Sequence, residues 1–172
     1  MSETEARDAE FAINQLKELA DNLQTACFVL SEAFDAVQEK KIDLMGFVGI
    51  NRMTMSWIVL SLFKVDELWR KYGRLAKSSK EGMKAVLKES RERGVPEFRN
   101  KVVAHLLDQD TKDPVEPERL QTMMVAIWRN DVQQFARWLA NPDPAHVDTV
   151  VRTLMSFRAE ILMRHPSTRI YI

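Results

Sequence analysis

The chain has 172 residues, with 25 basic and 25 acidic side chains, 45% apolar residues and a single cysteine. This length predicts one helical domain over residues 1–172, with a core at 6–164 and a tail at 165–172. The lone Cys27 excludes an intrachain disulfide and a cysteine-rich metal site. We therefore expect a reducing, cytoplasmic location.

No segment has the length of an uncharged membrane span. The most apolar region is free of charge only from Met53 to Phe63, whereas a span needs about 20 residues. The first ten residues are acidic and have no apolar run after a basic start, so they do not form a signal peptide. The sequence predicts no membrane association.

The zero net charge hides an uneven distribution. Residues 1–45 carry six more acids than bases, and residues 68–104 carry seven more bases than acids. Such a local basic block can bind a polyanion, because phosphates respond to charges within a Debye length of ~8–10 Å. The alternative is a solvated basic face that docks on the acidic amino-terminal helix.

The first two predicted elements are long helices. Residues 6–40 contain no Gly or Pro, and apolar residues recur every three or four positions from Leu16 to Val37. The second helix, at about 43–72, is almost solidly apolar around Trp57, as expected of a central helix. Trp57 and Trp69 are predicted to be core or interface residues.

The later elements are shorter. A capping box, Ser78 to Glu81, predicts the start of a third helix that ends near residue 93. A fourth helix begins near Glu97 and ends before an acidic loop at 108–114. A fifth is predicted at 117–140, opened by a proline, and a last one runs from Asp143 and Pro144 to about residue 164.

No segment alternates with a period of two, so no strand is predicted. The expected fold is all-α, an antiparallel bundle of about five to six helices. Trp128 and Trp138 are predicted to pack inside it, and His146 and His165 to lie on its surface.

Several kinds of site are excluded by their motifs. The chain has no glycine-rich phosphate loop and no G-x-S-x-G, H-E-x-x-H or C-x-x-C motif. Its three histidines are far apart in sequence, and the acids Asp108, Asp110 and Asp113 lack the glycine and glutamate of a calcium loop. We expect no metal and no cofactor.

The remaining candidate lies at residues 98–105, where Arg99, Asn100 and His105 come close together in sequence. An arginine can hold a phosphate through two hydrogen bonds, and a histidine can transfer a proton near neutral pH. RNA supplies its own nucleophile, the 2′-hydroxyl, so a cation and an imidazole suffice for cleavage without metal.

In a regular α-helix, six residues separate Arg99 from His105 by ~9 Å along the axis and ~240° around it. One pair therefore does not converge on one phosphate. A homodimer formed through this helix would gather two arginines and two histidines in one cleft. Lys101 and Asp108 neighbour His105 on the helix surface, where Lys101 would add phosphate affinity and Asp108 would fix the imidazole tautomer.

Arg91 and Arg93, from the same basic segment, are further candidates for phosphate binding. The spacing alone is not specific, because Arg158 and His165 are separated similarly. The second pair differs in having an alanine, not an asparagine, after the arginine.

These residues give the chain a resemblance to HEPN domains. Arg99-Asn100, the five residues before His105 and the acidic turn after it resemble the R-polar-x(4–6)-H signature, most like the AbiU2-type group. The likeness extends over roughly residues 10–140, including the long first helix and the apolar second helix that contains Leu62-Phe63.

The resemblance implies a helical bundle that dimerises through its motif helices. It also implies a metal-independent endoribonuclease of a toxin–antitoxin, phage-defence or CRISPR-linked system. Arg99 and His105 would be the catalytic pair and Asn100 the polar residue that supports them.

Two other functions remain open. One is a non-catalytic helical dimerisation module, the partner of an antitoxin, a nucleotidyltransferase or another component of such a system. The other is a scaffold that binds polyanions through residues 70–101.

Overall fold

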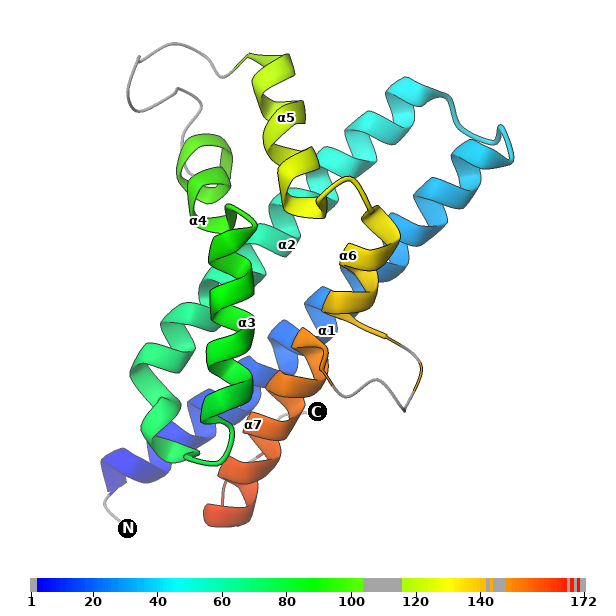
Figure 1. The fold of residues 1–172 in the computed structure, drawn as a ribbon. Coiled ribbons are helices and arrows are strands. Elements are labelled where there is room, and N and C mark those ends of the chain that lie inside the picture. The colour runs from blue at the N-terminus through cyan, green and yellow to red at the C-terminus, as the bar shows by residue number, and fades with distance from the viewer. Residues whose placement is uncertain are drawn as a thin grey trace.

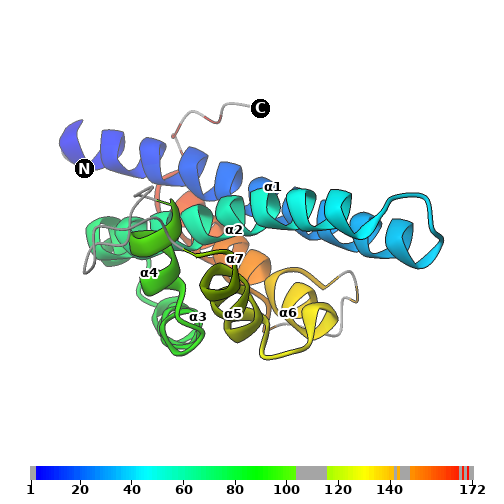
Figure 2. The ribbon, with the colours of Figure 1, turned by 90° about the horizontal axis from the view of Figure 1, so that it is seen from above.

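The computed structural model describes residues 3–103, 116–141, 143, 148–166, 168 and 170. All regular structure in these ranges is helical, which confirms the predicted all-α fold. The helices form two layers: α1 and α2 pair along one side, and α3, α5 and α6 lie on the other (Figure 1, Figure 2). α7 packs against α1 beside them.

The elements follow one another along the chain with short connections. In order they are α1 (Glu3–Gln38), α2 (Leu44–Tyr72), the 3-10 turn η1 (Gly73–Leu75), α3 (Lys80–Glu92), α4 (Val95–Phe98), the π-helical turn η2 (Arg99–Val103), α5 (Pro117–Trp128), α6 (Val132–Leu139) and α7 (Val150–Arg164).

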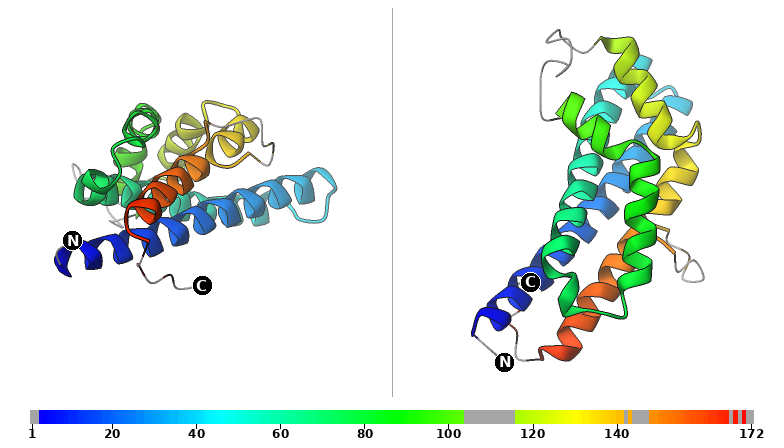
Figure 3. Two further views of the ribbon diagram at one scale, coloured as in Figure 1. Left: turned by 90° about the horizontal axis from the view of Figure 1, so that it is seen from below. Right: turned by 60° about the vertical axis from the view of Figure 1, so that its left-hand side comes forward.

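The first two helices agree with the predicted ranges to within a few residues. Lys40 takes a left-handed conformation, φ 59°, in the turn between them. Asp43 then caps α2 by accepting a hydrogen bond of 2.7 Å from Gly46 N. The resulting hairpin is long, and its tip projects past α6 (Figure 3, left).

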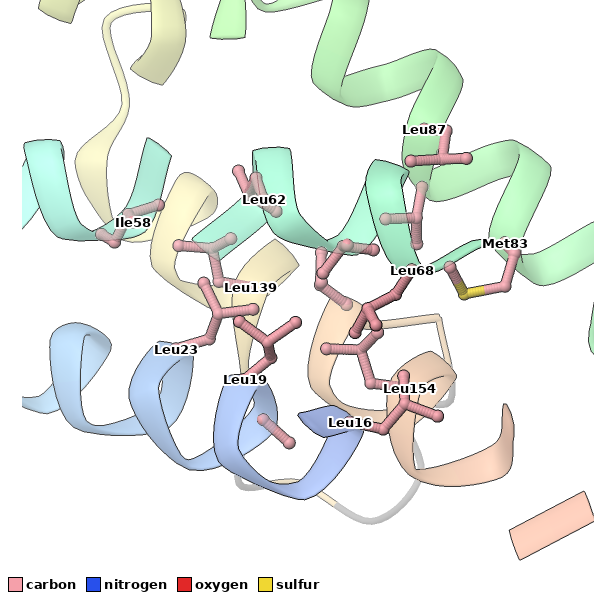
Figure 4. Packing of buried hydrophobic residues seen from close by; sticks show 14 of the residues in the cluster. Leu16, Leu19, Leu23, Ile58, Leu62, Leu68, Met83, Leu87, Leu139 and Leu154 are labelled. Atoms are coloured by element: carbon pink, nitrogen blue, oxygen red, sulfur yellow. The ribbon is translucent and has the colours of Figure 1, made fainter. Parts of the chain in front are cut away.

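One cluster of buried apolar side chains reaches from Ala9 in α1 to Ile161 in α7. Leu19 and Leu23 of α1 point toward α2, and Leu16 lies beside Leu154 of α7 (Figure 4). Met83 of α3, Leu139 of α6 and Leu154 of α7 lie in the same cluster (Figure 4). The 3–4 spacing that predicted α1 therefore does mark its buried face.

The predicted capping box at the start of α3 is wrong. Ser79, not Ser78, is the N-cap residue, its side chain makes no cap hydrogen bond within the helix, and Glu81 is exposed beside Lys84. The free N–H groups of Ser78 and Ser79 are bound instead by the carboxylate of Glu160 on α7, each at 2.9 Å. Glu160 on α7 therefore satisfies the backbone donors that the predicted capping box was expected to satisfy.

The single helix predicted at 117–140 is wrong, because the chain turns after Trp128. Arg129 and Asn130 both have positive φ, and Asp131 begins α6 by accepting a hydrogen bond from Gln134 N at 2.8 Å. The last helix also begins later than predicted. Thr149 caps it through Arg152 N at 3.2 Å, and Asp143 is not helical.

The fourth predicted helix begins at Val95, two residues early. Gly94 is in the left-handed region with φ 77°, and Pro96 stands in the first turn, where its missing N–H costs no helical hydrogen bond. The α-helix lasts only to Phe98, and a π-helical turn follows. The predicted continuation beyond residue 103 lies outside the described residues.

Several large apolar side chains of α2 are exposed. Six of them are between 38% and 77% exposed: Leu44, Met45 and Val48 in the first two turns, next to the hairpin tip, and Met53, Trp57 and Leu60 further along the helix. Among the described segments, Leu44–Leu75 is the one long and apolar enough to cross a membrane by length and composition. The core helix of a bundle meets the same criterion, and α2 is packed against α1.

Candidate functional site

Arg99 is the first residue of the π-helical turn and is held against α2. Its guanidinium carbon lies 4.4 Å from the centre of the Phe63 ring, a cation–π contact. Its Nη1 donates a hydrogen bond of 3.0 Å to Oδ1 of the exposed Asn100. The ring contact and the hydrogen bond together restrict the motion of the guanidinium.

This arginine has no acidic partner in the part of the chain that the structure describes. Glu97, the acid nearest to Arg99 in sequence, lies 3.4 Å from Lys101 instead, and the Nε of Arg99 is buried with no hydrogen-bond partner among the described residues. A guanidinium that is oriented by an aromatic ring and not neutralised by a carboxylate retains its capacity to bind an anion.

The π turn changes the geometry assumed from the sequence. In a π-helix the backbone bonds join residues five apart, not four, so the helix is wider than an α-helix. The separation of ~9 Å and ~240° for Arg99 and His105 assumed a regular α-helix and does not apply over Arg99–Val103. Such turns are frequent at functional sites.

His105 and Asp108, the predicted proton-transfer residue and its support, lie outside the described residues. Their pairing with Arg99 therefore stays a prediction. His146 lies outside them as well. His165 is described and is buried, 7% exposed, at the end of α7, so its predicted surface position is wrong.

Of the three predicted phosphate-binding residues other than Arg99, Arg91 is the exposed one. Lys101 is half-buried beside Glu97. Arg91 is exposed on α3, with its Nη2 3.4 Å from Oδ1 of Asp66, which also pairs with Arg70. Both cations are thus partly neutralised by neighbouring carboxylates.

Arg93 occupies a different environment from the one predicted. It is 5% exposed, its Nη1 donates to the backbone oxygen of Ile127 at 2.7 Å, and its Nε lies 2.9 Å from Glu89 Oε1. Its guanidinium carbon lies 4.9 Å from the ring centre of Trp138. Burial lowers the pKa of Arg93, against the opposing effect of Glu89. Arg93 therefore connects α3 with α5 and α6 through these contacts, and its side chain is shielded from solvent.

Two acids outside the basic segment reduce its surplus of positive charge. The count of seven already includes the acids within the segment, such as Glu81, which pairs with Lys84. Asp8 of α1 pairs with Arg74, and Asp66 of α2 pairs with Arg70 and Arg91. A net positive charge therefore remains on this segment.

The predicted packing of the tryptophans is confirmed for three of them. Trp69 packs edge-on against Phe157 at 5.3 Å, Trp128 donates to Met55 Sδ at 3.0 Å, and Trp138 stacks with Arg93. Trp57 differs from them in being 39% exposed, on α2.

Sequence reasoning missed Phe63 as part of the site. It lies 36 positions before Arg99 in the chain, and only the packing of η2 on α2 brings the two together. An aromatic residue at the edge of an apolar helix was the available signal, but it is typical of any core helix.

Comparison with known proteins supports the fold and names no activity. No protein-family profile matches the chain. No curated protein matches it either. Among solved structures it is similar to the integron cassette protein Vpc_cass2 from the mobile metagenome of V. paracholerae, with 18% sequence identity and a TM-score of 0.77. The match covers 94% of this chain and 98% of that one, so nearly the whole bundle is shared.

Proposed function

We propose that the chain is a metal-independent endoribonuclease that cuts RNA at a site shared between two copies. The 2′-hydroxyl attacks the adjacent phosphorus, the 5′-oxygen leaves, and the strand ends in a 2′,3′-cyclic phosphate. His105 transfers a proton as base or acid, and Arg99 holds the phosphate as negative charge builds up on it.

The state of Arg99 is the observation that carries this proposal. A guanidinium with no described carboxylate partner is matched to a phosphate, and its contact with Phe63 limits its motion. Less of its conformational freedom is lost on binding than for a free surface arginine. Asn100 supports it by accepting from Nη1, and Nε is buried, which leaves Nη2 for the substrate.

Because the partner copy brings a second arginine and histidine, the proposal includes a homodimer through the motif helix. Trp57 and Leu60 are exposed apolar residues of α2, the helix that also contains Phe63. Large apolar side chains that are exposed together on one helix are typical of an interaction surface. This observation also favours the second candidate function, a non-catalytic dimerisation module.

Incubation of the purified protein with mixed RNA in EDTA tests the two functions. The endoribonuclease predicts cleavage with cyclic phosphate ends and a loss of about 100-fold or more in Arg99→Ala and in His105→Ala. Arg70→Ala, an exposed arginine of the same basic segment, is the matched control and should cleave normally.

Equal cleavage by all four proteins would indicate a contaminating nuclease and refute the proposal. No cleavage by any of them, together with a dimer in light scattering that Trp57→Lys dissociates, would establish the dimerisation module instead. Loss of activity in Arg70→Ala equal to that in Arg99→Ala would show a general charge effect and no specific site.

A further inference from the structure

A second candidate site, remote from Arg99, is a cavity of about 570 Å³ between α1, α6 and the start of α7. This volume is in the range of small-molecule sites, roughly 300–1,000 Å³. The cavity is independent of the proposed ribonuclease site, because none of its lining residues belongs to α4 or η2.

The two long walls of the cavity have different shapes. The α1 wall presents the rings of Phe28 and Phe34, and Phe28 is 64% exposed although it is a large apolar side chain. The α6 wall presents the small residues Ala136 and Ala140, one helical turn apart, next to Val132. Aromatic side chains opposite alanines leave a slot that suits an apolar chain or a flat ring.

The floor of the slot is apolar and closed. Leu30 is 1% exposed and Cys27 is 8% exposed, and the Cys27 Sγ lies 3.7 Å from the backbone oxygen of Ala136. Burial raises the pKa of this thiol to about 12, against a smaller opposing effect of a backbone hydrogen bond from Ala140. The thiol therefore stays neutral and contributes to the cavity as an apolar group.

Charged side chains lie on the rim of the cavity. In the part of the chain that the structure describes, neither Arg137 nor Asp35 has a hydrogen bond or ion pair through its side chain. Arg152, in the first turn of α7, also lines the cavity, and its Nη2 donates a hydrogen bond of 3.3 Å to the backbone oxygen of Asp143. Binding of an anion at the rim therefore depends on Arg137.

Asp35, the acid of the rim, lies far along α1 from the point at which α1 contacts α6. Asp35 follows Cys27 by eight residues, which is about 12 Å along α1, whereas Arg137 directly follows Ala136, the residue that Cys27 contacts. A ligand in the slot would therefore contact Arg137 and Asp35 at different places along the cavity. Its charged group would be stabilised near Arg137 if that group is negative.

We infer that this cavity binds an amphiphilic organic anion, with an apolar chain or ring in the slot and a carboxylate at Arg137. The apolar walls supply the larger part of the affinity by removing hydrocarbon from water. Arg137 selects for negative charge, since a guanidinium binds a carboxylate through paired hydrogen bonds.

Isothermal titration calorimetry of the full-length protein with decanoate, below its micelle concentration, tests this inference. We expect saturable binding of one decanoate per chain and binding of decylammonium, which has the same chain and the opposite charge, at least about tenfold weaker. Arg137→Gln should weaken decanoate about tenfold, and Arg7→Gln, an exposed arginine near the start of α1, should not.

A second variant tests the slot separately from the charge. Ala136→Phe places a ring in the cavity and should abolish decanoate binding while the helical circular dichroism is retained. Absence of saturable decanoate binding would overturn the inference. So would unchanged affinity in Arg137→Gln, a variant at an exposed position that should fold normally, or binding of decylammonium as tight as that of decanoate.

Discussion

Replacement of Glu160 by glutamine changes a buried cap while keeping the side-chain shape. The Glu160 carboxylate accepts three hydrogen bonds of 2.9 Å, from Ser78 N, Ser79 N and Ser79 Oγ, and lies 2.7 Å from Arg164 Nη2. A glutamine offers one oxygen in place of two, so its amide nitrogen must face a donor. Loss of one or two hydrogen bonds to a charged group predicts a decrease of about 2–4 kcal/mol in the free energy of unfolding.

The effect should depend on pH with a definite sign. Burial alone would raise the pKa of Glu160, but the hydrogen bonds from Ser78 and Ser79 outweigh it and lower that pKa below its ordinary value of 4.5. A lowered pKa in the folded state means that the stabilisation is present above pH 4.5 and is lost as the pH falls through the folded-state pKa.

Urea unfolding of both proteins at neutral pH and at about pH 3 measures the effect. The difference in stability between the wild type and Glu160→Gln should be full at neutral pH and smaller in acid. Glu81→Gln, at an exposed glutamate in the first turn of α3, should change stability by less than about 0.5 kcal/mol. A Glu160→Gln protein as stable as the wild type at neutral pH would refute the assignment of this residue as the cap of α3.

Three further predictions concern other residues that the fold uses. Arg93→Ala should lower stability in urea by about 3 kcal/mol because it removes a buried ion pair and a hydrogen bond to Ile127, whereas Arg91→Ala, on the surface, should cost under about 1 kcal/mol. Asp131→Ala should lower the free energy of unfolding by about 1 kcal/mol through loss of the α6 cap. Asp143→Ala should not lower it in this way, because α7 starts at Val150 and Asp143 does not cap it. Cys27, with its pKa raised by burial, should react with a thiol reagent far more slowly in the native protein than in urea, and rapid native labelling would contradict its buried position.

The fold was largely predictable because its strongest signals are local. The apolar period of α1, the solid apolar run of α2 and the Asp43 cap all act within a few residues of one another. The break between α5 and α6 also had a local signal, since Asn130 tolerates the left-handed conformation and Asp131 is a favoured N-cap residue. The continuous apolar pattern of 117–140 obscured it.

The site was less predictable because its contacts join distant parts of the chain. Arg93 looked like another surface cation at a helix end, and only the packing of α5 and α6 around it explains its burial. Glu160 and Phe63 act on residues 81 and 36 positions away. Residue type and spacing identified Arg99 and Asn100 as candidates, but not the ring that orients the arginine.

The proposed sharing of one site by two copies is tested most directly by mixing two inactive variants. Arg99→Ala and His105→Ala proteins, each inactive alone on RNA in EDTA, are combined and allowed to exchange subunits. A mixed dimer holds one intact arginine and one intact histidine in its common cleft, so the mixture should regain cleavage. A mixture as inactive as its two components, although mixed dimers have formed, would contradict a shared site.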